Sequence, residues 1–145
     1  MVAKNLEAKT LYQAAFDGDV QTILRLLEAG AEIDAVDPKH GDTPLLFAIE
    51  NLQDEAVRVL LERGADPNLR GYRGTTPLQA AIDVAVEQAK RRFDSTGDVV
   101  PADTRTLERL LGAGADPLQV DANGESAVDW AKSVQHLRAV ALFAK

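Results

Sequence analysis

The chain contains an internal repeat, and this repeat restricts its fold more than any other feature of the sequence. The tripeptide Thr43-Pro44-Leu45 recurs 33 residues later as Thr76-Pro77-Leu78. A second marker, Gly-Ala followed by an acidic residue, begins at Gly30, Gly64 and Gly114, and each copy follows a pair of leucines. Repeats of this length indicate supersecondary units that stack side by side, because one such unit cannot bury its apolar face alone.

The residues at the expected helix ends in each unit predict two helices and a turn. The pair Thr76-Pro77 is expected to cap and begin a first helix, since the missing N–H of proline is no loss at that position. Gln79 at the third helical position completes a capping box. The pair Leu60-Leu61 belongs to the buried stripe expected of a second helix, and Gly64 is expected to end that helix in the left-handed conformation. A polar stretch with a further glycine then predicts a hairpin.

The pattern D-x-x-G-x-T-P-L-x-x-A-A…L-L-x-x-G-A-D resembles the ankyrin repeat, whose period is about 33 residues. The resemblance covers nearly the whole chain. It implies an all-α ankyrin-repeat solenoid, built as a single domain over residues 1–145 from four stacked helix-turn-helix units with hairpin loops. The expected units are approximately 3–36, 37–69, 70–119 and 120–145.

One departure from the family pattern concerns the histidine that usually follows T-P-L. Counted along the repeat, its place is taken by Tyr12, Leu46, Gln79 and Asp129. The hydrogen bonds that this histidine makes between neighbouring units in the family are therefore expected to be replaced or lost.

The third unit carries an insertion. It is 17 residues longer between Pro77 and Gly114 than the second unit is over the matching stretch. The spacing of its apolar residues predicts a first helix prolonged to about Phe93, followed by a loop over 94–103 and a second helix near Thr104 that Asp103 caps.

Two interpretations of the insertion remain open. It either lengthens a surface loop, which costs little free energy, or adds contact surface for a partner. In the second case the candidate contacts are Lys90, Arg91, Arg92 and Phe93. The three basic residues also suit a solvated helix end, where they complement the helix dipole.

The charge balance indicates what kind of partner the chain prefers. Sixteen basic and 23 acidic residues give a formal net charge of −7. Such a surface repels nucleic acids and anionic membranes, and attracts a partner protein with a basic surface. The sequence has no cysteine, no apolar run of transmembrane length, and no signal-peptide core near its first residue. We therefore expect a cytoplasmic protein.

The sequence contains no motif of an enzyme. It lacks the glycine-rich nucleotide-binding loops, the nucleophile elbow and the metalloprotease helix. The two histidines, His40 and His136, are expected far apart, in a hairpin turn and near the last helix. The hairpin aspartates are interpreted as turn residues rather than metal ligands. We expect no catalysis, no cofactor and no metal.

The resemblance implies that hairpin tips and the exposed side of the first helices form a concave face for a partner protein. Aromatic anchors surrounded by polar residues are typical of interface hot spots. We expect a chain that is a monomer when unbound. The candidate protein-binding residues on this face are Lys39, His40, Asp42, Phe47, Glu50, Tyr72, Arg73, Thr75, Asp83, Asn123 and Glu125.

Three interpretations of function are left by the sequence. Small acidic ankyrin proteins resemble bacterial immunity proteins, or antitoxins, which would here imply neutralisation of a basic nuclease toxin. A structural or assembly scaffold that acts through self-association is the alternative. A small-ligand or catalytic site within the insertion is the third interpretation, and it requires a deep pocket with convergent polar groups.

Overall fold

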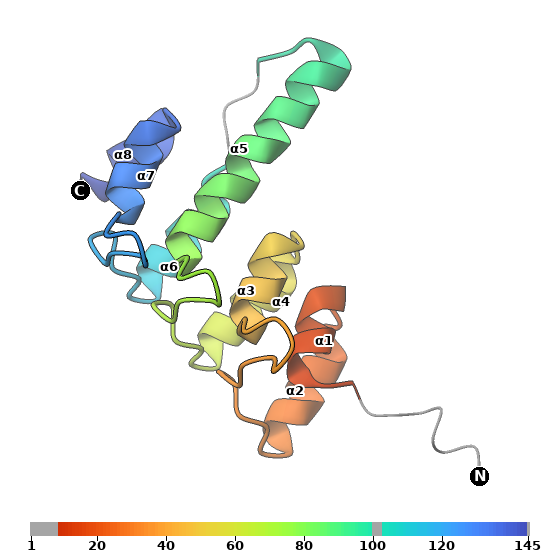
Figure 1. Ribbon diagram of the computed structural model, residues 1–145. Coiled ribbons are helices and arrows are strands. Elements are labelled where there is room, and N and C mark those ends of the chain that lie inside the picture. Colours follow the sequence, from red (N-terminus) through yellow and green to blue (C-terminus); the bar gives the residue numbers. More distant parts are fainter. Residues whose placement is uncertain (1–8, 100–102, 145) are drawn as a thin grey trace.

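The computed structural model describes residues 9–99 and 103–144. Within them the chain forms eight α-helices (Figure 1), and the only β pairing there is an isolated bridge between Val120 and Ser126. The helices are α1 (Leu11–Asp17), α2 (Val20–Glu28), α3 (Pro44–Glu50), α4 (Asp54–Glu62), α5 (Pro77–Thr96), α6 (Arg105–Gly112), α7 (Ala127–Ser133) and α8 (Leu137–Phe143).

The helices pair in chain order and the pairs stack in a row (Figure 1). The first helices α1, α3, α5 and α7 each contact the next one, and the second helices α2, α4 and α6 do the same in a second layer. Within each unit the first helix packs on the second. This is the predicted solenoid of helix-turn-helix units, in which neighbours bury each other's faces.

The first helices all begin at a hydroxyl residue. In each case the hydroxyl accepts a hydrogen bond from the backbone N–H three residues on, which satisfies one of the unpaired donors at a helix start. In α1, α5 and α7 the side chain at the third helical position bonds back to the cap and completes a capping box. The caps are Thr10, Thr43, Thr76 and Ser126.

The predicted alignment of the first unit is wrong by one residue. Because Thr10 is the cap of α1, Gln13 and not Tyr12 is the third helical residue and takes the position of the family histidine. The turn after α1 is shorter than the turn after α3. Gly18 directly follows α1 and adopts the left-handed conformation, with a φ of 71°. After α3 the left-handed residue is Leu52, with a φ of 60°, and Asn51 stands between it and the helix.

The core lies between the two helix layers. Most of the buried alanines lie on the first helices, and larger buried apolar side chains come from both helices of a pair. Small residues allow a close approach of helices, and the larger ones supply the buried area that stabilises the stack. The fully buried residues include Ala48, Ala131, Ile23, Leu60 and Leu110, each 0% exposed.

The third unit departs from the others through its long first helix. Helix α5 has 20 residues and ends at Gly97, so residues 94–96 are helical rather than the start of the predicted loop. Residues 100–102 of that loop lie outside the described residues. The cap of α6 is Thr104, and Asp103 stands one residue before it, where its carboxylate accepts the Arg105 N–H at 2.9 Å. The prediction of Asp103 as the cap is therefore wrong by one residue.

Replacement of Leu60 by alanine tests the buried second-helix stripe. Leu60 is 0% exposed, so Leu60→Ala is expected to lower the free energy of unfolding by about 2–5 kcal/mol through the cavity it leaves. Urea unfolding followed by circular dichroism measures the loss. Leu118, which is 71% exposed, provides the matched control, and Leu118→Ala is expected to cost less than about 0.5 kcal/mol. A loss below about 1 kcal/mol for Leu60→Ala would contradict the packing described.

Candidate protein-binding face

The hairpin of the second unit is held by a buried carboxylate. Asp37, which is 3% exposed, accepts the N–H groups of Lys39 at 3.1 Å and His40 at 3.0 Å, and it pairs with the His40 ring. Burial acts to raise the pKa of the Asp37 carboxyl, but these donors outweigh it and hold that pKa below its usual value. The tip is thus fixed, and the side chains of Lys39 and His40 are exposed on it.

The hairpin of the third unit is tied to the preceding one. Its turn has Gly71 at the position that Asp37 takes in the second unit, and the carboxylate of Asp42 accepts the Tyr72 N–H at 3.2 Å. A Cβ at Gly71 would lie 2.3 Å from that carboxylate, so a larger residue there would displace the Asp42 side chain. Tyr72 itself is 81% exposed.

The hairpin of the fourth unit is linked to the third by a glutamine. Asp121 accepts the N–H groups of Asn123 and Glu125 at 2.8 and 2.9 Å. The Gln79 side-chain amide donates to the Asp121 carboxylate at 3.0 Å and to the Glu125 carbonyl at 3.1 Å. Gln79 therefore supplies an inter-unit hydrogen bond at the position of the absent family histidine. Leu46 at the corresponding place is an apolar core residue.

Two adjoining grooves lie between these tips and the first helices. The first groove, between units one and two, has a volume of about 1120 Å³, and the second, between units two and three, about 490 Å³. Both are lined by Lys39, His40, Asp42 and Glu50. The first groove adds Phe47 together with Tyr12, Phe16 and Asp17, and the second adds Tyr72, Arg73 and Thr75.

Aromatic rings gather in the first groove around Phe47. Its ring centroid lies 5.9 Å from that of Tyr12, 6.2 Å from Phe16 and 6.0 Å from His40. Tyr12 was not among the residues predicted for this face. The capping box between Thr10 and Gln13 is the sequence signal that fixes the register of α1 and places Tyr12 correctly.

Glu50 and Asp83 on the first helices are exposed residues whose carboxylates are nonetheless partly desolvated by their surroundings. Burial raises the pKa of Glu50, the negative charge of Asp42 raises it further, and Arg73 opposes both. Burial also raises the pKa of Asp83, against the hydrogen bond that the Trp130 indole donates at 2.6 Å. Both groups would be stabilised in their ionised form by an added positive charge.

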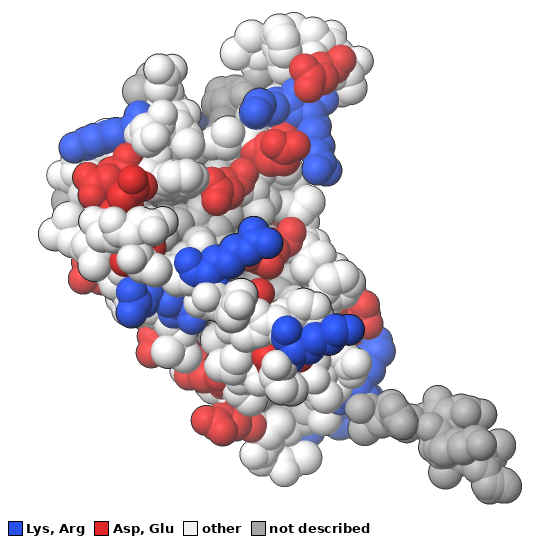
Figure 2. Space-filling view, in the orientation of Figure 1, with Lys and Arg blue, Asp and Glu red and all other residues white. Residues whose placement is uncertain are grey.

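The acidic side chains of the described residues form no continuous surface on the side of the molecule seen in Figure 1. Figure 2 shows basic and acidic side chains interspersed over the side seen in Figure 1. A basic partner that approaches this side meets separate acidic positions and no continuous acidic surface.

Three of the predicted face residues line neither groove. Asp83 lies on α5 and bonds Trp130, and the exposed Asn123 and Glu125 lie at the last hairpin. These three residues belong to units three and four, and none of them contributes to the lining of either groove.

The insertion residues lie apart, on the part of α5 that extends beyond the stack (Figure 1). Lys90 and Phe93 line a third groove of about 390 Å³, which Val99 and Val134 also line. Arg91 pairs with Glu87 at 3.1 Å, and the side chain of Arg92 is exposed.

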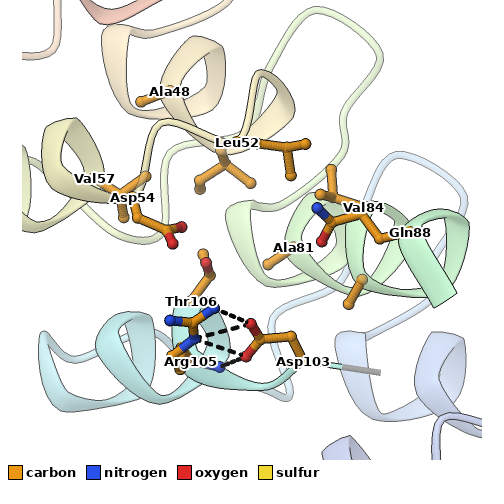
Figure 3. A pocket seen from close by; sticks show the side chains of 12 residues that line it. Ala48, Leu52, Asp54, Val57, Ala81, Val84, Gln88, Asp103, Arg105 and Thr106 are labelled. Atoms are coloured by element: carbon orange, nitrogen blue, oxygen red, sulfur yellow. Dashed lines mark hydrogen bonds and ion pairs between the residues drawn. The ribbon is translucent and has the colours of Figure 1, made fainter. Parts of the chain in front are cut away.

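A small pocket of about 120 Å³ lies where the α3–α4 turn, α5 and the start of α6 meet (Figure 3). Its guanidinium and one of its carboxylates are already joined, because Arg105 pairs with Asp103 at 2.6 Å. This pocket therefore holds no pair of unused opposite charges.

In the described residues no group of three or more histidine, cysteine or acidic side chains is placed to hold a metal ion. Helices long and apolar enough to span a bilayer are likewise absent from that part of the chain. The buried His136 caps the start of α8, because its Nδ1 accepts the Ala139 N–H at 3.1 Å. Burial lowers the pKa of His136. His40 and His136 thus have separate structural roles.

Stacked helix pairs, hairpins tied from unit to unit and grooves along one face define the class of helical repeat proteins that bind other proteins. The family profile "Ankyrin repeats (3 copies)" matches residues 11–89, which is more than half of the chain. The chain belongs to the ankyrin-repeat family, a non-catalytic module that mediates protein–protein interaction.

Curated relatives contain this module within much longer proteins. The chain is 43% identical over 79 residues to the "B-cell lymphoma 3 protein homolog" of Mus musculus, which covers 54% of the chain and 18% of that protein. It is 33% identical over 143 residues to the "Mitochondrial disaggregase" of Bos taurus, which covers 84% and 21%. It is 30% identical over 146 residues to the "Neurogenic locus notch homolog protein 1" of Xenopus laevis, which covers 89% and 6%. The chain therefore spans only 6–21% of the length of these relatives.

The sole tryptophan provides a test of the carboxylate beside it. Because burial raises the pKa of Asp83, Trp130 fluorescence is expected to titrate with a midpoint above 3.8, the ordinary value for an aspartate. Emission spectra recorded from about pH 3 to pH 7 measure this midpoint. The transition is expected to disappear in Asp83→Asn. Its persistence in that variant would show that another group is responsible.

Removal of the insertion tests whether it belongs to the core. The side chains of residues 90–99 described here are exposed, and the Arg105–Asp103 pair is a surface pair, so neither contributes much to stability. A variant in which a short turn replaces residues 90–103 is expected to remain helical and to unfold cooperatively on heating. Loss of the cooperative transition by circular dichroism would make the insertion part of the core.

Proposed function

We propose that the chain binds a partner protein through its concave face, with the two adjoining grooves and the hairpin tips as the contact surface. The observation that carries this proposal is the arrangement of Lys39, His40, Asp42 and Glu50, which line both grooves at once. The surface is therefore continuous across three units, which suits an extended contact with another protein.

The fixed hairpins support this proposal. The carboxylates of Asp37, Asp42 and Asp121 hold the tips through backbone N–H groups. A surface that is ordered before binding loses less conformational entropy when a partner docks. Exposed Tyr72 then provides an aromatic anchor of the kind found in interface hot spots.

The partner is expected to present basic side chains to this face. Burial and the charge of Asp42 raise the pKa of Glu50, so a cation placed beside it relieves an unfavourable interaction that exists in the free protein. The net charge of −7 adds long-range attraction, which accelerates association with a basic protein.

A basic nuclease toxin is one partner with this chemistry. The phosphate-binding cleft of such an enzyme carries positive charge, and an acidic face that covers the cleft would neutralise it. The net charge and the hairpin tips held by backbone hydrogen bonds support this form of the proposal. Under it the chain is an antitoxin, or immunity protein, and a nuclease is the protein that it captures.

The extended part of α5 is proposed as a second contact. Phe93 is 51% exposed and Val99 is 86% exposed, and both line the third groove beside Lys90. Arg91 and Arg92 add exposed positive charge to the same helix. This contact would let the chain engage a second, chemically different region of its partner.

We further propose that the chain has no catalytic activity of its own and acts as a monomer in the cytoplasm. The exposed large apolar residues support the monomer, because they are scattered over all four units, from Phe16 to Val120. The cysteine-free sequence suits a reducing compartment.

Substitution of Tyr72 and Arg73 tests the binding face. The double variant Tyr72→Ala, Arg73→Ala is expected to bind the natural partner at least tenfold more weakly, because truncated hot-spot residues typically cost more than about 1.4 kcal/mol. Both side chains are exposed, so the melting temperature is expected to stay nearly unchanged. Immobilised protein and native cell extract identify the partner, and titration calorimetry with the purified partner measures the affinity at low and high salt.

Arg63→Ala is the control, because Arg63 is an exposed arginine at the end of second helix α4 and lines neither groove. The control is expected to bind like the unchanged protein. Equal affinity of the double variant and the control would refute the proposed face. Sedimentation equilibrium shows whether either variant departs from a monomer.

A further inference from the structure

The first groove combines aromatic rings with two carboxylates, Asp42 and Glu50, that form no ion pair within the described part of the chain. Phe47 is flanked by Tyr12, Phe16 and His40 within 6.2 Å between ring centroids. Glu50 and Asp42 lie in the same lining. A cation over aromatic faces is attracted by the ring quadrupoles, and carboxylates beside it add hydrogen bonds.

Most of the charged side chains that line the first groove already form ion pairs with each other or with neighbouring residues. Lys9 pairs with Asp17 at 3.0 Å and with Asp19 at 3.2 Å, and the His40 ring pairs with Asp37. This leaves Asp42 and Glu50 with Lys39 as the unpaired cation of the lining, while Arg73 in the adjoining groove partly offsets the charge of Glu50. The remaining charge is negative, and it lies next to the rings.

We propose that the first groove is a subsite for one arginine side chain of the partner protein, with the guanidinium against the Phe47 ring cluster and within reach of the Glu50 carboxylate. This inference rests on the proposed protein-binding function and names the side chain that the face selects. A guanidinium is planar, weakly hydrated and always charged, so it stacks on rings and still pairs with a carboxylate.

Other occupants fit the groove less well. A neutral apolar side chain would cover Glu50 and bring no charge, which leaves a carboxylate further desolvated at a cost in free energy. A lysine ammonium is strongly hydrated and loses more water against the rings than a guanidinium does. The groove is therefore expected to prefer arginine to lysine and lysine to norleucine.

Three short peptides test this preference without knowledge of the partner. The probes are acetyl-Gly-Arg-Gly-amide and its lysine and norleucine counterparts, each titrated to about 10 mM because a single side chain is expected to bind with millimolar affinity. Chemical shifts of the ¹⁵N-labelled protein locate the binding. The arginine peptide is expected to shift signals of Phe16, His40 and Phe47, and the norleucine peptide to leave them unchanged.

Two variants separate the ring contact from the charge contact. Phe47→Leu and Glu50→Gln are each expected to weaken the arginine peptide about two- to fivefold, the effect of one exposed cation–π or charged contact. Glu50 is exposed, so Glu50→Gln provides the test if Phe47→Leu fails to fold. Tyr72→Ala in the second groove is the matched control and is expected to have no effect on this peptide.

Binding of the norleucine peptide as tightly as the arginine peptide would overturn the inference, and so would an arginine peptide that shifts no signal in the first groove. Binding of the natural partner by these variants tests the proposed binding face separately from the arginine subsite. If Tyr72→Ala, Arg73→Ala loses the natural partner while Phe47→Leu and Glu50→Gln retain it, the binding face stands and the arginine subsite fails. If all of these variants retain the partner, the binding face itself is wrong.

Discussion

Every unit of this chain depends on its neighbour for burial of its apolar face. Helices of seven to nine residues are too short to be stable alone, and most of the helices described have that length. Alanines such as Ala48 and Ala131 let the first helices approach closely, and leucines such as Leu60 and Leu110 fill the layer behind them. Stability therefore comes from contacts between units, and a change in one interface is expected to weaken the adjacent units too.

The same contacts that stack the units also set the geometry of the binding face. Asp42 of one hairpin accepts the backbone N–H of Tyr72 in the next, and Gln79 bonds the Asp121 hairpin beyond it. The first of these bonds ties together the two hairpins whose residues line the second groove. A substitution at Asp42 would consequently alter the lining of both grooves and remove a hydrogen bond that holds the second one.

Most of the fold was predictable from the sequence, because caps and turns are local and carry their own signals. The Thr76-Pro77 start and the hairpin aspartates needed no tertiary information. The end of α5 did, since Asp94 to Thr96 are poor helix formers, yet they continue a helix already made. Tyr12 was missed from the groove around Phe47 for another reason. One residue fewer in the first unit shifts the register of α1, and only the pairing of Thr10 with Gln13 corrects it.

Net charge is a weak guide to what this face attracts, because most of the acidic residues in the grooves and turns already have structural partners. Asp37 and Asp121 hold backbone N–H groups, Asp19 caps α2, and Glu55 and Glu62 pair with Arg58 on the outer layer. Such groups gain little from an external cation, since their charge is already satisfied. Glu50 differs, because burial and the nearby Asp42 disfavour its ionised form and raise its pKa. Selectivity for a basic partner thus depends on a few carboxylates beside aromatic rings, and much less on the total of −7.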